Sequence, residues 1–131
     1  MSNLEIYCVT NKSLEFLEKL PFKLIAVGEE KFSDKYLRCD THDNIYYKEK
    51  YYSELTFHYW YWKNMLNIEN KNWVGFCQKR RIWIKNDLKN NNIEINSIND
   101  HLLTEIDEKY SKYDSFICQP IYVSGAKKQK C

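Results

Sequence analysis

Two short apolar runs near the start of the chain, separated by a short helical pattern, constrain the fold more than any other feature. Leu4 to Thr10 (LEIYCVT) and Phe22 to Val27 (FKLIAV) each have the length and composition of a buried strand. Between them, Ser13 to Leu20 has the pattern of a short helix, with Ser13 as its cap and Pro21 after its end. A strand, a helix and a second strand in this order favour an α/β fold, in which helices cover the faces of a sheet.

Later segments continue the alternation of helix and strand. Tyr51 to Leu66 is predicted to be one helix, with Ser53 as a plausible cap. The apolar positions at helical spacing on one of its faces are Leu55, Tyr59, Trp62 and Leu66. Further expected elements are a strand at Trp73–Cys77, its continuation or a second short strand at Ile82–Ile84, a helix at Asp100–Tyr110 and a strand at Ser115–Cys118. The polar stretch Glu29–Lys50 has no clear period and is predicted to be a long loop.

The length and charge of the chain are those of one ordinary globular domain. With 131 residues, the chain is long enough to bury a core without cross-links. We expect residues 1–123 to form that domain and residues 124–131 to form a frayed basic tail. The net charge of +2, from 20 basic and 18 acidic residues, argues against a dedicated polyanion-binding protein. No stretch approaches the roughly 18 apolar residues of a membrane span, and no secretory signal is visible.

The cysteines favour a protein of the reducing cytoplasm. There are 5 of them, they are scattered, and no two form a Cys-x-x-Cys pair. This pattern fits free thiols better than a disulfide framework or a zinc site. Three of them, Cys8, Cys77 and Cys118, lie in apolar runs and are predicted to be small core residues.

The predicted topology also indicates where a ligand would bind. In open α/β sheets, ligands bind beyond the carboxyl ends of the strands, where the strand order reverses. Thr10, Lys12, the loop after Val27 and the polar segment after Cys77 all follow predicted strands. We therefore expect these segments to face one crevice.

Two segments carry a more specific likeness. Asp43 to Asn64 reads DNIYYKEKYYSELTFHYWYWKN, and Trp73 to Trp83 reads WVGFCQKRRIW. Together they resemble a family found in bacterial capsule and lipopolysaccharide gene clusters, a domain of unknown function (family 4422) regarded as glycosyltransferase-like. The family pattern is roughly D-N-I-S, then E-L-T-A-L-Y-W-I-W-K-N, then Y-V-G-F-C-H-Y-R-R-Y-F. The matching positions are Asp43, Asn44, Ile45, Glu54, Leu55, Thr56, Tyr59, Trp60, Trp62, Lys63, Asn64, Gly75, Phe76, Cys77, Arg80 and Arg81.

The likeness extends from about Ile6 to Pro120. The opening IYCVTNK is similar to the start of the family, and YDSFICQP is similar to a later strand of it. The chain departs from the family pattern at Gln78 and Lys79, where the family has His and Tyr. The chain is also shorter than a complete nucleotide-sugar transferase domain, so we expect it to correspond to the front part of one.

The resemblance implies a function and a set of ligands. It implies a partial GT-A-like, Rossmann-like sheet that binds a nucleotide-sugar and transfers the sugar to a glycan or a lipid-linked acceptor during synthesis of surface polysaccharide. It implies a cytoplasmic enzyme and leaves open a Mn²⁺ or Mg²⁺ ion. An acidic pair that would hold such an ion in D-x-D spacing is not found near a strand end, since Asp40 and Asp43 are three apart.

The resemblance and the crevice rule together select the candidate site residues. Glu54 and Asp43 are the catalytic candidates. The nucleotide-sugar-binding candidates are Thr10, Lys12, Asp40, Asn44, Thr56, Gln78, Arg80 and Arg81. Arginine suits phosphate oxygens because its guanidinium is a planar fork of donors, and a carboxylate can act as the base that deprotonates an acceptor hydroxyl.

Each candidate also has an ordinary structural interpretation. Asp43 and Asn44 favour turns, and Arg80 and Arg81 are compatible with solvated surface charges. Glu54 and His58 lie four apart and are compatible with a simple helical contact. Trp60 and Trp62 lie on different faces of the predicted helix, so that one of them is free to reach the crevice while the other is buried.

Two other classes of protein stay open. The basic run Lys79–Lys85, which includes Trp83, suggests a module that binds single-stranded nucleic acid, although the near-neutral charge counts against it and we expect no nucleic-acid partner. The short length suggests an inactive remnant that retains nucleotide binding. A truncated domain would also leave one sheet face uncovered and prone to association.

Overall fold

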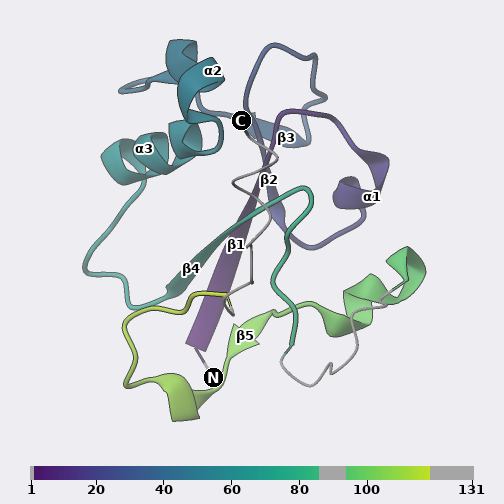
Figure 1. Cartoon of the computed structure of the whole chain (residues 1–131). Helices are drawn as coiled ribbons and strands as arrows, with labels where there is room; N and C mark the ends of the chain where they lie inside the picture. Colours follow the sequence, from purple (N-terminus) through teal and green to yellow (C-terminus); the bar gives the residue numbers. More distant parts are fainter. Residues whose placement is uncertain (1, 86–93, 119–131) are drawn as a thin grey trace, which may run out of the picture.

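The computed structural model, which describes residues 2–85 and 94–118, is a five-stranded open sheet flanked by helices (Figure 1). The strands are β1 (Ser2–Thr10), β2 (Lys23–Ala26), β3 (Tyr36–Arg38), β4 (Trp73–Gln78) and β5 (Glu105–Ile106). Four of them pair in parallel in the order β3-β2-β1-β4, and β5 pairs antiparallel with the start of β1. The predicted α/β architecture is confirmed.

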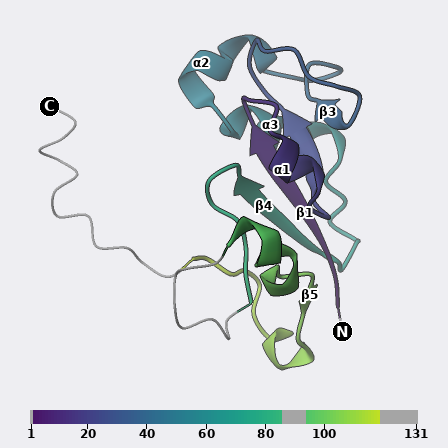
Figure 2. The ribbon, with the colours of Figure 1, turned by 90° about the vertical axis from the view of Figure 1, so that its right-hand side faces the viewer.

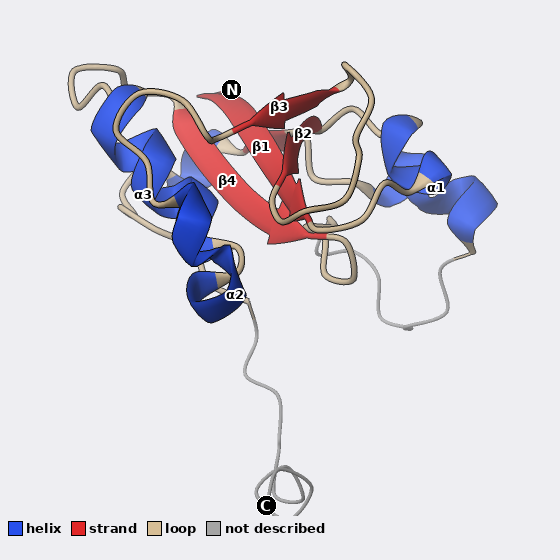
Figure 3. Cartoon of the chain, turned by 90° about the horizontal axis from the view of Figure 1, so that it is seen from above, coloured by secondary structure: helices blue, strands red, loops and turns tan. Residues whose placement is uncertain are grey.

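The order of the strands places helices on both faces of the sheet. The chain runs outward from β1 to β2 and β3 and then returns to place β4 on the other side of β1. The short helix α1 (Glu15–Glu18), between β1 and β2, lies on one side of the sheet (Figure 3). The longer α3 (Leu55–Asn64), which precedes β4, lies on the opposite side. The strand order therefore reverses between β1 and β4.

Alternate residues of β1 supply the two halves of the core. Ile6 and Cys8 pack on the α1 side, whereas Tyr7 and Val9 pack on the α3 side. All four are at least nine-tenths buried. A central parallel strand covered on both faces needs apolar residues at every position, which explains the continuous apolar run in the sequence.

The predicted helix at 51–66 is two helices rather than one. A 3₁₀ turn (Tyr46–Lys48) leads into α2 (Glu49–Tyr52), and the chain then breaks at Ser53, where φ is 48° and ψ is −123°. Ser53 ends α2 and makes no side-chain cap to α3. The break turns α2 over the carboxyl edge of the sheet while α3 follows the sheet face (Figure 1).

The predicted apolar face of the second helix is not the buried one. Leu55 and Trp62 are 53% and 57% exposed, whereas Phe57 and Trp60 are buried. Phe57 packs against Tyr7, with ring centroids 5.3 Å apart. Because α3 is apolar on both faces, helical spacing did not reveal which face the sheet covers.

The chain after β4 differs most from expectation. In place of a helix at Asp100–Tyr110 there are a 3₁₀ helix (Ile95–His101), β5 and a second 3₁₀ helix (Glu108–Tyr110). Backbone pairing determines this region: Leu103 N donates to Trp83 O, and β5 pairs with the start of β1. Figure 2 shows β5 and the neighbouring 3₁₀ helices at the amino end of β1, away from α2.

The last described residues also correct two expectations. Ser115–Cys118 is not a strand, and Cys118 is exposed rather than part of the core. Cys8 is fully buried, as predicted, and Cys77 is half-buried beside it on β4. The predicted tail at 124–131 lies outside the described residues. Within the described ranges, no helix is long and apolar enough to cross a membrane.

Candidate functional site

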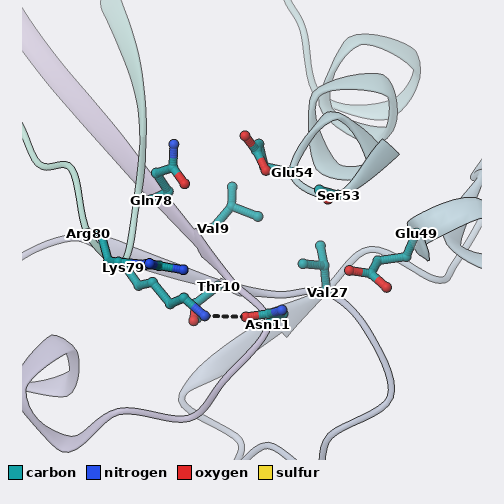
Figure 4. Close-up of a pocket in the computed structure, with 10 residues that line it drawn as sticks. All are labelled: Val9, Thr10, Asn11, Val27, Glu49, Ser53, Glu54, Gln78, Lys79 and Arg80. Carbon is teal, nitrogen blue, oxygen red and sulfur yellow. Dashed lines mark hydrogen bonds between the residues drawn. The ribbon is translucent and has the colours of Figure 1, made fainter. Parts of the chain in front are cut away.

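A cleft of about 180 Å³ lies at the carboxyl edge of the sheet (Figure 4). The ends of β1, β2 and β4 form one wall, and α2 with the start of α3 forms the other. The lining residues are Val9, Thr10, Asn11, Val27, Glu49, Ser53, Glu54, Gln78, Lys79 and Arg80. The cleft therefore occupies the point between β1 and β4 where the strand order reverses.

A tight turn at the end of β4 aims two cations at the cleft. Gln78 N donates to Arg81 O at 3.1 Å, and Arg81 N donates to Gln78 O at 3.0 Å. Lys79 and Arg80 occupy the two positions between these paired residues, and both line the cleft. Arg81 is engaged through its backbone on the return side of the turn and does not line the cleft. The turn therefore places Arg80 in the lining of the cleft and leaves Arg81 outside it.

The end of β1 shapes the same wall. The buried Thr10 hydroxyl donates to Lys12 O at 2.7 Å and accepts from Lys12 N at 3.0 Å. This local turn presents the Asn11 side chain, whose Oδ1 accepts from Lys79 Nζ at 2.6 Å. Figure 4 shows this contact as the link between the ends of β1 and β4. The Lys79 ammonium is thereby held at the mouth of the cleft.

The opposite wall depends on the turn after β2. Gly28 has a φ of 86°, a left-handed conformation that glycine adopts without strain. Its carbonyl accepts a hydrogen bond from the Tyr46 hydroxyl, which ties the turn to the segment that leads into α2. A Cβ at Gly28 would lie 3.5 Å from the Glu49 carboxyl carbon, so Glu49 packs directly over this turn. Glu54 begins α3, where the helix dipole favours a carboxylate.

The walls of the cleft carry opposite charges. Lys79 and Arg80 are on the strand side, and Glu49 and Glu54 are on the helix side (Figure 4). The cleft is smaller than the roughly 300–1,000 Å³ pockets that enclose drug-sized ligands. It suits the charged part of a ligand, with cations for an anionic group and carboxylates for a hydroxyl or a cation.

Four of the predicted site residues meet in this cleft: Thr10, Glu54, Gln78 and Arg80. Lys12 is exposed outside it. Thr56, in the first turn of α3, is fully buried, with no hydrogen-bond partner for its hydroxyl among the described residues. Neither Thr56 nor Arg81 is part of the cleft lining.

The acidic loop candidates lie away from the cleft and organise the loop before α2. Asn44 Oδ1 accepts from Tyr46 N, and Asn44 Nδ2 donates to Asp40 O and His42 O. Asp43 Oδ1 accepts from the Tyr59 hydroxyl at 2.9 Å. The turn interpretation of Asp43 and Asn44 describes their geometry, and the catalytic role of Asp43 stays a prediction.

Further lining residues escaped the sequence-based selection of site residues. Asn11 and Lys79 directly follow β1 and β4, so the rule that ligands bind beyond strand ends could have identified them. Glu49 lies in the loop after Val27 that was expected to face the crevice, but it was not selected by residue. Ser53 could not be found in this way, because it enters the cleft only through the break between α2 and α3.

His58 lies one helical turn after Glu54 but packs inward. Its ring is 4.5 Å from the Phe76 ring, and burial lowers its pKa, an effect that the nearby Glu54 carboxylate partly opposes. Trp83, central to the nucleic-acid alternative, is half-buried, and its indole N–H donates to Phe76 O at 2.9 Å. It is therefore not presented as a free stacking platform.

The described residues contain no group of three His, Cys, Asp or Glu side chains that could hold a metal ion. A Mg²⁺ ion often needs only one or two carboxylates together with substrate phosphates. Glu49 and Glu54 are the carboxylates in the cleft, but the described geometry assigns no ion to them.

Comparison with known proteins gives one match. No curated protein and no solved structure is significantly similar to the chain. Residues 5–129, nearly the whole chain, match the family described as "Domain of unknown function (DUF4422)". The chain therefore belongs to this family.

Proposed function

We propose that the chain is the nucleotide-sugar-binding part of a GT-A-like glycosyltransferase that acts in the synthesis of surface polysaccharide. The observation that carries this proposal is the charged cleft at the reversal point of a parallel sheet. The likeness of the Asp43–Asn64 and Trp73–Trp83 segments to a glycosyltransferase-like family supports the same assignment.

In the proposal, Lys79 and Arg80 bind the diphosphate. A diphosphate that leaves from a sugar accumulates negative charge, and fixed cations stabilise that charge most effectively where water is partly excluded. Arg80 contributes a planar fork of donors, whereas Lys79 contributes a point charge already positioned by Asn11. The Asn11 and Gln78 amides provide further donors at the same wall.

Glu54 is the proposed general base. Its carboxylate lies across the cleft from Arg80 (Figure 4), so an acceptor hydroxyl on the helix side would lie between the base and the donor sugar. Glu49, on the same wall, is placed to accept hydrogen bonds from sugar hydroxyls. No step of this proposal is routed through a metal ion.

Ligand-dependent thermal unfolding tests the binding step. A nucleoside diphosphate or nucleotide-sugar at 100 times its Kd adds about 2.7 kcal/mol, which raises the Tm by several degrees. We expect one nucleotide class to produce this shift, with or without Mn²⁺. Arg80→Ala should abolish it, and Arg81→Ala, the adjacent arginine outside the cleft, should retain it. A folded sample that shifts with no nucleotide overturns the proposal.

Hydrolysis of the bound nucleotide-sugar, in which water takes the place of the acceptor hydroxyl and nucleoside diphosphate is released, tests the catalytic step. Glu54→Gln should leave the thermal shift intact and slow release by about 10²-fold or more, because removing a general base typically costs that much. Glu69→Gln, on the exposed loop after α3, is the matched control and should release at the wild-type rate. Equal rates in both variants would remove Glu54 from the mechanism.

A further inference from the structure

The outer side of α2 and α3 carries an apolar surface that no described element covers. Most of the exposed large hydrophobic side chains in the described ranges fall between residues 47 and 68. We define the outer helical face as Tyr47, Leu55, Tyr59 and Trp62. Figure 3 shows α3 with its inner side against the sheet and its far side directed away from the molecule.

The members of the outer helical face are neighbours. Tyr59 and Trp62 meet edge to face, with ring centroids 5.9 Å apart. Tyr47, from the segment before α2, lies close enough to interact electrostatically with the Tyr59 hydroxyl. Leu55, four residues before Tyr59, extends the same helical spacing at the start of α3. The surface along α3 is therefore continuous and is not a scatter of single exposed residues.

Lysines are interleaved with these aromatic rings. Lys63 Nζ lies 3.9 Å from the centre of the Trp62 ring, and Lys48 Nζ lies 5.5 Å from that of Tyr47. Lys50 lies over Tyr51 in the same way at 5.0 Å. The two glutamates of this segment, Glu49 and Glu54, line the cleft instead. The nearby Asp43 carboxylate accepts the Tyr59 hydroxyl hydrogen bond.

From this pattern we propose that the outer helical face docks on the headgroup region of an anionic lipid bilayer. Tyrosine and tryptophan rings with a polar end are enriched at that depth of a membrane. Lysines whose stems lie along apolar rings can keep their ammonium groups among anionic headgroups. A second copy of the chain would bring Lys48, Lys50 and Lys63 against the same three lysines about a two-fold axis, which their mutual repulsion disfavours.

This docking also orients the cleft. The segment from Tyr46 to Asn64, which carries the outer face, also supplies Glu49, Ser53 and Glu54 to the cleft. A bilayer on the outer face would therefore lie one helix layer from the cleft. Membrane docking by this face does not depend on the proposed transfer reaction, so either can be overturned without the other.

Co-sedimentation with lipid vesicles tests the proposal. The full chain should bind vesicles of phosphatidylcholine mixed with phosphatidylglycerol and bind pure phosphatidylcholine vesicles more weakly, with binding reduced by added salt. Leu55→Ser should lower the partition coefficient about tenfold, since it removes one inserted side chain. Leu37→Ser, a leucine 45% exposed on β3, is the matched control and should bind like wild type.

A charge variant and a test of self-association complete the design. Lys63→Glu should weaken vesicle binding about fivefold or more, and Lys31→Glu, on an exposed loop, should not. Thermal unfolding checks that each variant is folded. Equal vesicle binding by Leu55→Ser and Leu37→Ser overturns the proposal. So does a dimer in lipid-free solution that Leu55→Ser dissociates while vesicles leave the wild type unbound.

Nucleotide binding on the same samples separates the two proposals. A chain that shifts with nucleotide but does not sediment with anionic vesicles overturns only the membrane-docking face. A chain that sediments with vesicles but shifts with no nucleotide overturns only the proposed function.

Discussion

Two tryptophans on α3, two positions apart, differ in burial because they lie on different sides of the helix. Trp60 is buried, and its indole N–H donates to Thr41 O at 2.9 Å. Trp62 is 57% exposed and carries Lys63 on its ring. The sequence placed them on different faces but did not say which face meets the sheet.

Phenylalanine substitutions at these two positions should have different costs. Trp60→Phe loses a hydrogen bond and part of a buried ring, so we expect a loss of about 2 kcal/mol in the free energy of unfolding. Trp62→Phe should change it by less than about 0.5 kcal/mol. Urea unfolding followed by far-ultraviolet circular dichroism measures both. Equal costs would mean that α3 presents its other face to the sheet.

His58 should make stability depend on pH. Its pKa is lowered from the ordinary value of 6.5 in the folded chain because of burial, although the Glu54 carboxylate partly opposes the shift. The unfolded chain therefore binds the proton more readily. Above pH 6.5, His58 makes its full contribution to the free energy of unfolding. That contribution decreases as the pH falls below 6.5, and it levels off below the lowered pKa of His58 in the folded chain.

Urea midpoints for wild type and His58→Gln across about pH 5 to 8 test this expectation. The wild type should lose stability relative to the variant as the pH falls, because only the wild type has the proton-binding ring. Parallel curves for the two proteins would show that His58 titrates with the same pKa in the folded and unfolded states.

The rule that ligands bind beyond strand ends made part of the candidate site predictable, and the family likeness added Glu54. Thr10 and Gln78 are the last residues of β1 and β4, Arg80 follows β4 by two positions, and all three line the cleft. Arg81, next to Arg80, does not line it, because a tight turn that the sequence did not reveal turns its backbone away. Charge and position alone could not separate the two arginines.

At the scale of elements, the break at Ser53 decides which side chains reach the cleft. Serine with a φ of 48° and a ψ of −123° occupies a region that glycine enters far more easily. This strained backbone conformation lies at the point where α2 turns over the edge of the sheet. A sequence with helical spacing on both sides of Ser53 gave no reason to expect the break.

Two substitutions of Ser53 distinguish the effect of backbone strain from the effect of losing the side-chain hydroxyl. Ser53→Gly should be about 1 kcal/mol more stable than Ser53→Ala, because both remove the hydroxyl but only glycine relieves the left-handed backbone. Chemical unfolding of the two variants measures the difference. If alanine proves as stable as glycine, Ser53 does not hold this conformation in solution.

The elements were predictable where periodicity and burial agree. β1, β2 and β4 lie within about two residues of their predicted bounds, because each is a short apolar run. The region after residue 94 was not predictable, because its backbone pairs with distant partners: β5 with the start of β1, and Ile84 with Leu102. Local pattern carries no information on such pairings.

At the scale of the whole molecule, β1 is the central strand of the sheet. It pairs with β2, β4 and β5, and its alternate residues supply both halves of the core. At its centre Ile6 pairs with Gly75. A Cβ on Gly75 would lie only 3.0 Å from Ile6 Cγ1, so the Ile6 side chain would have to shift to admit alanine there.

A double-mutant cycle tests this contact. Gly75→Ala should destabilise the chain by about 2 kcal/mol through overpacking. Ile6→Ala removes the opposing atom at its own cost, so the double variant should be more stable than the sum of the single effects predicts. Chemical unfolding of the four proteins measures the coupling. Strict additivity would show that the two residues are not in contact.

The pairing of β1 with β4 also limits how early the sheet can form while the chain is being synthesised. β1 leaves the ribosome well before β4, yet Leu4 pairs with Trp73 and Val9 with Gln78. At about 5–20 residues per second, several seconds pass between the emergence of one strand and of its partner. Throughout that interval the central strand of the sheet has one open edge, so the nascent chain depends on slow, long-range closure rather than on local structure.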